Sequence, residues 1–154
     1  MTSSCGVINY YTDPGPGTVY RAHVFTSSGT FTVTDLGLIG TTVEYLVVAG
    51  GGSGGADTTS GGGGAGGVRT NLSGNPYSTP VSFPVSAGPT SYTITVGAGG
   101  AGVSGRNIGN DGSDSVFSSI TSIGGGAGSG YMQQANAGGS GGGSGWGANT
   151  PGAG

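Results

Sequence analysis

The chain has 154 residues and almost no charged side chains. It contains no lysine, and its three arginines and six acidic residues give a formal net charge of -3. A surface that follows the phosphates of DNA or RNA, or that binds an anionic membrane, requires many more cations. We therefore expect no nucleic acid among the partners of this protein.

Long apolar runs, cysteines and histidines are scarce as well. The sequence has no apolar run of about 18 residues, and residues 1–13 lack the regions of a secretory signal, so we expect neither membrane insertion nor export by that route. Cys5 is the only cysteine, which excludes an intramolecular disulfide and a multi-cysteine metal site. With one histidine and one glutamate, few titratable groups can converge. We expect no enzyme, no cofactor and no metal site.

Glycine is in large excess, with 40 residues. At this frequency the GxGxxG pattern at residues 97–102 arises by chance, and the residues after it do not predict the helix that a nucleotide phosphate requires. The GxSxG pattern at residues 51–55 and 138–142 lacks the strand-to-helix turn of a nucleophile elbow. His23 lies in a predicted strand beside Arg21, and we interpret it as a satisfied structural histidine.

The stretches between the glycines are rich in β-branched and aromatic residues, which predicts an all-β fold in the form of a small β-sandwich. Residues 19–25 and 30–34 flank a short Ser-Gly turn and predict a hairpin. Residues 81–86 and 91–96 predict a second hairpin, in which Pro84 confines its strand to an edge or a bulge.

Two further segments complete the predicted strands. Residues 43–48 form an almost continuous apolar run, which is typical of a strand covered on both faces, and residues 115–123 predict a third short pair. The expected core consists of apolar side chains from these segments: Phe25, Phe31, Val43, Tyr45, Val47, Phe83, Tyr92, Ile94, Val96, Phe117, Ile120 and Ile123.

Three glycine tracts, at residues 49–67, 97–105 and 124–154, each follow a predicted strand. One interpretation is that they are flexible linkers. The other is that they are polyglycine II helices with three residues per turn, packed side by side so that their backbone groups bond between segments. Because strand ends anchor the tracts on one scaffold, we favour packed polyglycine II-like segments, ordered further by association of several chains.

Five segments follow one another in a characteristic order: VFTSSGTFTVTD, VEYLVVAGGGSGG, GGGGAGGVRTN, YTITVGAGGAG and GSDSVFSSITSIGGGAGSG. This series resembles the glycine-rich domain of bacteriophage tail-fibre and other virion proteins. The resemblance covers residues 22–130, as a glycine-rich β domain. Residues 1–21 are then an N-terminal attachment or oligomerisation segment, and residues 131–154 a glycine-rich C-terminal segment. The resemblance implies a structural or adhesive part of a phage fibre.

The resulting hypothesis is a non-enzymatic virion structural protein, part of a tail fibre or a capsid-attached fibre, with adhesion to the host surface. Its expected partners are further copies of itself in a homo-oligomer, with a trimer as one option, other virion proteins, and a host surface glycan or protein. It is expected in the virion, assembled in the host cytoplasm and extracellular after lysis. The alternative is a subunit of a bacterial extracellular or cell-surface fibril or adhesin, which requires export.

The candidate contact residues are Tyr131, Met132, Gln133, Gln134 and Trp146. Aromatic side chains set among glycines cannot be buried by their own segment. They either pack on a neighbouring subunit or on the β core, or form a contact surface for sugar rings or a protein partner.

Two aspartates lie in the segment GNDGSDS, at residues 109–115. Asp111 and Asp114 weakly resemble a calcium-binding loop, because hard cations need clustered oxygen ligands. Asn-Asp-Gly is in the first place a sequence that forms turns, and this is the interpretation that we favour.

Overall fold

The computed structural model describes residues 2–3, 6–12, 14–15, 17–36, 40–76, 78–79, 81–86, 88–147 and 150–154. Cys5 lies outside these residues. Within them the chain forms strands and no helix, and hence no helix that is long and apolar enough to span a bilayer. The expectation of an all-β fold is confirmed.

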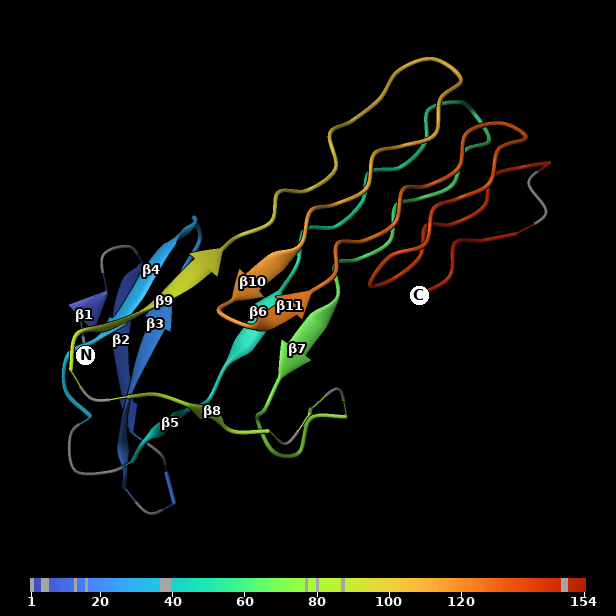
Figure 1. Ribbon diagram of the computed structural model, residues 1–154. Coiled ribbons are helices and arrows are strands. Elements are labelled where there is room, and N and C mark those ends of the chain that lie inside the picture. The colour runs from blue at the N-terminus through green and yellow to red at the C-terminus, as the bar shows by residue number, and fades with distance from the viewer. Residues whose placement is uncertain are drawn as a thin grey trace.

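The strands form one larger sheet and three small ones (Figure 1). The larger sheet is antiparallel, in the order β1 (Thr2–Ser3), β4 (Gly29–Val33), β9 (Thr90–Thr95), β10 (Ser115–Phe117) and β11 (Ile120–Ser122). The small sheets are antiparallel pairs: β2 (Val7–Thr12) with β3 (Val19–Val24), β5 (Thr42–Val43) with β8 (Phe83–Pro84), and β6 (Leu46–Val48) with β7 (Val68–Thr70).

Two of the three expected hairpins are wrong. β3 pairs with β2 and not with β4, and β8 pairs with β5 and not with β9. β4 and β9 instead pair with each other, with Phe31 opposite Tyr92. This long-range pairing places the aromatic side chains of both strands on the face that the core covers, which the local turns would not do. The third expected pair, β10 with β11, is confirmed.

The hydrophobic core lies where the larger sheet meets the small sheets of β5, β6 and β8. Its buried residues are Phe31, Val33, Val85 and Phe117. Partly buried side chains pack around them: Phe25, Leu36, Val43, Tyr45, Val47, Phe83, Tyr92, Ile94 and Ile120. Of the expected core residues, Val96 and Ile123 lie outside this cluster, and Ile123 is exposed.

Two further expectations concern Pro84 and the strand at residues 43–48, and only the first is confirmed. Pro84 sits in a strand that has one partner only, so its expected edge position is confirmed. The expectation that residues 43–48 are covered on both faces is wrong, because Leu46 and Val48 are exposed while Val47 packs against the core. This segment alternates, as a strand with one covered face does.

His23 of β3 packs its ring edge-on against Phe31, with 5.2 Å between the ring centroids. Neither ring nitrogen has a hydrogen-bond partner among the described residues, so the expectation of a satisfied histidine is wrong there. Burial, and secondly the positive charge of Arg21, lower the pKa of His23 below its usual value of 6.5. The neutral ring is therefore the form that the fold favours.

Beyond the sheets, the glycine tracts run side by side as an extended bundle (Figure 1). They continue from the ends of β6, β9 and β11 and return into β7 and β10. Their hydrogen bonds repeat every third residue. The N–H groups of Ala49, Gly52 and Gly55 donate to the carbonyl oxygens of Gly67, Gly64 and Gly61. Those of Gly50, Ser53 and Ala56 donate to Ser113, Asn110 and Asn107.

This three-residue period is that of polyglycine II, in which each segment turns a different face to each neighbour. The packed arrangement is thus the one that the structure has. All the bonds above lie within one chain.

Residues 124–130 form a buried run at the centre of the bundle. The N–H groups of its first six residues, 124–129, are all bonded. Gly125 and Gly128 donate to the carbonyl oxygens of Gly50 and Ser53, and Gly126 and Ser129 donate to those of Ser140 and Gly143. Gly124 and Ala127 donate to the carboxylates of Asp114 and Asp111. No buried donor is left unpaired in residues 124–129, as burial of a backbone demands.

Close approach of the backbones explains why glycine is required at the centre. A Cβ atom on Gly126 would collide with the backbone carbonyl oxygen of Asn136. Gly102 lies in a different environment, since a Cβ atom there would have no atom within 4 Å.

We predict opposite outcomes for alanine at these two glycines. Gly126→Ala should lower the free energy of unfolding by about 2 kcal/mol or more, because the neighbouring segment must move away and lose its hydrogen bonds. Gly102→Ala should leave stability unchanged or raise it slightly, because alanine loses less backbone entropy on folding. Denaturant unfolding of both variants measures the difference, and equal stabilities would contradict the packing described here.

Candidate functional site

The turns at residues 57–59, 105–106, 131–132 and 146–147 gather at the end of the bundle that lies away from the β-sheets (Figure 1). The bend at residues 138–140 lies at the other end, where the N–H of Gly139 donates to the carbonyl oxygen of Gly124. The backbone holds the turns at the far end together. The N–H of Trp146 donates to the carbonyl oxygen of Thr59 at 2.8 Å, and the N–H of Met132 lies 3.4 Å from the carbonyl oxygen of Trp146. Turns that are distant in sequence therefore form one surface, which we call the bundle tip, consisting of Asp57–Thr59, Arg106, Tyr131–Gln134 and Trp146.

An aromatic stack is the main feature of the bundle tip. The rings of Tyr131 and Trp146 lie nearly parallel, with 5.7 Å between their centroids and an interplanar angle of 26°. The guanidinium carbon of Arg106 lies 5.1 Å from the centroid of the Tyr131 ring, a cation–π contact. The Nε of Arg106 is also 3.2 Å from the Oδ2 of Asp57. Trp146 nonetheless stays 65% exposed.

All five predicted contact residues belong to the bundle tip, but their side chains are placed differently. Tyr131 and Trp146 form the stack, and Met132 is exposed beside Gly147, where its Cγ restricts the space next to the glycine. Gln133 folds back, with its Oε1 over Gly130, and Gln134 is exposed. The aromatic residues pack on each other and not on the β core.

Sequence reasoning missed Arg106 and Asp57. Asp57 lies in a turn inside the first glycine tract, as Tyr131 and Trp146 do inside the third, and Arg106 directly follows the second tract. Because antiparallel tracts of similar length return to the same sheet, their turns must meet at one end. The positions of the turns in the sequence could thus have predicted which residues meet at the bundle tip.

Asp111 and Asp114 have a structural role that the sequence analysis did not foresee. The Oδ1 of Asp114 accepts a hydrogen bond from the N–H of Gly124 at 2.8 Å, and the Oδ1 of Asp111 accepts one from the N–H of Ala127 at 2.7 Å. Asn136 donates to both carboxylate oxygens of Asp111 at 3.0 Å. The aspartates are three residues apart, as are the amides that they bind, so they follow the period of the bundle.

Neither aspartate belongs to a larger ligand group. Among the residues that the structure describes, no three side chains of histidine, cysteine, aspartate or glutamate lie together where a metal ion would bind.

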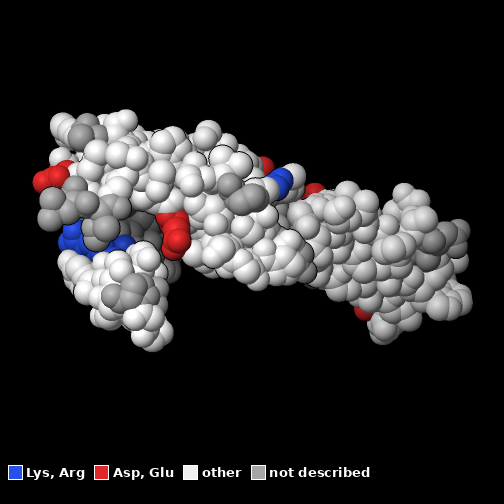
Figure 2. Space-filling view, turned by 90° about the horizontal axis from the view of Figure 1, so that it is seen from below, with Lys and Arg blue, Asp and Glu red and all other residues white. Residues whose placement is uncertain are grey.

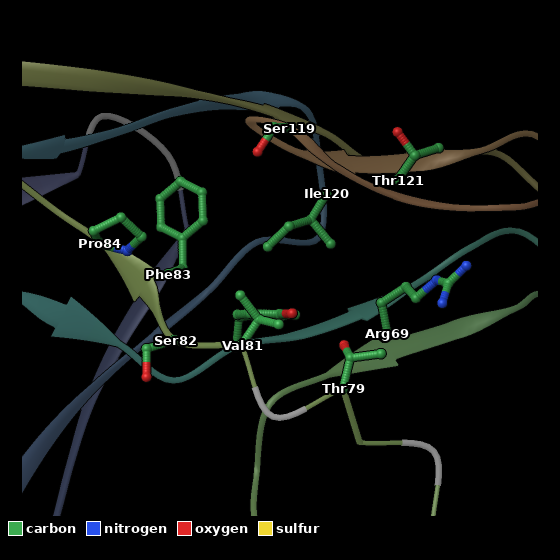
Figure 3. Close-up of a pocket in the computed structure, with 10 residues that line it drawn as sticks. Arg69, Thr79, Val81, Ser82, Phe83, Pro84, Ser119, Ile120 and Thr121 are labelled. Carbon is green, nitrogen blue, oxygen red and sulfur yellow. The ribbon is translucent and has the colours of Figure 1, made fainter.

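A groove lies beside β7 and β8 and has a volume of about 500 Å³ (Figure 3). The side chains of Val81, Phe83 and Ile120 converge on it, whereas the guanidinium group of Arg69 points away from them (Figure 3). Among the described residues, Arg69 is the only charged one that lines it. The other described lining residues are apolar, aromatic or hydroxyl-bearing, so they supply no acid–base pair.

A family model described as a glycine-rich domain matches residues 26–154. The chain belongs to the glycine-rich domain family. The match starts just before β4 and includes the bundle and its tip. Comparison with the curated proteins and with the solved structures finds no match.

We predict that Asp111 stabilises the glycine-rich domain through its acceptor oxygen and not through its charge. Asp111→Ala should reduce the free energy of unfolding by about 1–3 kcal/mol, because it leaves the buried N–H of Ala127 without a partner. Asp111→Asn keeps an acceptor oxygen and should cost less than half as much. Denaturant unfolding compares the two, and an equal loss would show that the hydrogen bond to Ala127 is unimportant.

Proposed function

We propose that this glycine-rich domain is a non-enzymatic structural and adhesive part of a phage tail fibre or capsid-attached fibre, and that the bundle tip contacts the host surface. The observation that supports this most is the exposed aromatic stack of Tyr131 and Trp146, which the bundle presents away from the sheets.

The bundle suits this role because it holds its turns rigidly. At its centre, residues 124–129 have no unpaired N–H group, and backbone bonds tie the turns of Thr59, Met132 and Trp146 to one another. A contact surface that is already ordered loses little entropy when it binds. The free face of Trp146 is therefore preorganised for a partner.

The chemistry of the bundle tip suits a sugar ring or an uncharged protein surface. An indole face offers a large apolar area for the C–H groups of a pyranose or for an apolar side chain. Arg106 and Asp57 neutralise each other at 3.2 Å, so they supply hydrogen-bonding groups without a net charge. The molecular surface agrees with such a partner, since Figure 2 shows only scattered charged residues and no broad patch of one sign on the face drawn.

The assignment to a virion rests on the order of the segments, which resembles phage fibre proteins. In the alternative, a bacterial surface fibril, the same bundle tip would act from a cell. An antibody against the domain distinguishes the two, because it should label virus particles and leave the surface of uninfected cells unlabelled.

We predict that Trp146→Ala and Tyr131→Ala each weaken binding to susceptible bacterial cells by about tenfold or more, as expected for central aromatic contacts. Val81→Ala is the control, because Val81 is about as exposed as Trp146 but lies beside the groove near the sheets. Binding of labelled protein to cells measures the effect, and thermal unfolding verifies the fold. Unchanged binding by both folded tip variants would refute the adhesive role.

A further inference from the structure

β2 and β3 form a ribbon that extends from the sheet end of the molecule, opposite the bundle tip (Figure 1). All six residues of β2 are exposed, although most of them are apolar or aromatic. Val7 and Tyr10 are 61% and 64% exposed, and they point to opposite faces of the strand. Both faces of β2 therefore present apolar surface to water.

β3 is the better covered strand of this pair. Its Ala22 and His23 are half-buried, and His23 touches Phe31 of the larger sheet. A two-stranded ribbon is marginally stable in water unless another element covers it. β2 thus lacks the cover that a stable strand of this composition needs.

The outer edge of β2 is open among the described residues. β2 pairs with β3 alone, in six consecutive pairs without a bulge. It contains neither lysine nor proline, which protect the edge strands of many sheets from pairing with other chains. Its free N–H and C=O groups can accept another strand.

We propose that β2 of a second copy of this chain pairs with this edge, antiparallel and about a two-fold axis at Asn9. The pairing joins the two ribbons into a four-stranded sheet. It does not depend on the adhesive role of the bundle tip, which lies at the other end of the molecule.

The sequence of β2 is complementary to itself in this register. Residues that lie directly opposite each other in a sheet point to the same face. A two-fold axis between two identical antiparallel strands must therefore place one residue opposite its own copy. With Asn9 on the axis, Val7 faces the partner's Tyr11 on one side of the sheet. Ile8 faces the partner's Tyr10 on the other side. Aliphatic residues opposite aromatic ones are stabilising cross-strand pairs.

The absence of charged residues in β2 also favours a second copy of this chain as the partner at its edge. None of its six residues is ionisable except through the tyrosine hydroxyls. Among the described residues, the one cation that lies over a ring of this strand is Arg21 of β3, whose guanidinium carbon is 5.4 Å from the centroid of the Tyr10 ring. The stack of Tyr11 on Tyr20, with 5.1 Å between the centroids, would continue across the new edge onto the partner's Val7. A second copy supplies a strand edge of the same length, with the same order of aliphatic and aromatic residues and without charged residues.

Two charge variants at the axis test the proposal. Asn9→Lys and Asn9→Asp each place two like charges opposite each other, and each should raise the dissociation constant of the dimer at least about a hundredfold. Sedimentation equilibrium over a wide concentration range should give twice the mass of one chain for the unchanged protein and one chain mass for either variant alone. An equimolar mixture of the two variants should again give twice the mass. Val81→Lys, at an exposed position outside the ribbon, should leave the dimer intact.

Several outcomes of the same experiment would contradict the proposed dimer. A single-chain mass of the unchanged protein at every concentration, a trimer, or a dimer that persists in both variants would overturn the proposal. Failure of the mixed variants to associate would also overturn it, because the register requires the two side chains at position 9 to meet. Circular dichroism of each variant confirms that the fold is retained.

Discussion

The backbone hydrogen bond between neighbouring glycine segments is the interaction on which this molecule depends. Ordering glycine costs more backbone entropy than ordering any other residue, so no single tract would be stable alone. In the bundle, every third residue bonds to the same neighbour, and the segment at residues 124–129 has all its donors paired. Within the bundle these bonds take the place of a side-chain core, which accounts for the scarcity of large apolar residues in the glycine tracts.

The β-sheets and the glycine bundle contribute to the fold in different ways. The β-sheets supply an aromatic core around Phe31 and Phe117, and their strand pairs fix where each glycine segment starts and in which register. Val48 pairs with Val68, and the next bond along the chain, from Ala49 to Gly67, already belongs to the bundle. The sheets thus act as a template, and the bundle carries the turns at its tip to a fixed place.

The all-β class, the packed glycine tracts and most of the core were predictable, because composition and strand patterns determine them locally. The strand partners were not. A Ser-Gly turn favoured a hairpin of β3 with β4, whereas burial of Phe31 and Tyr92 selected the distant pairing of β4 with β9. The roles of Asp111 and Arg106 were likewise invisible, because they depend on which tracts become neighbours. Tyr131 and Trp146 were found because aromatic residues among glycines stand out in any arrangement.

Amide hydrogen exchange at residues 124–129, followed by NMR, tests the central claim most directly. If these amides are bonded as described, they exchange only when the whole domain unfolds, as slowly as the amides of β10 in the core. Exchange at the rate of an unstructured chain, while β10 stays protected, would show that the tracts are flexible linkers and would contradict this account.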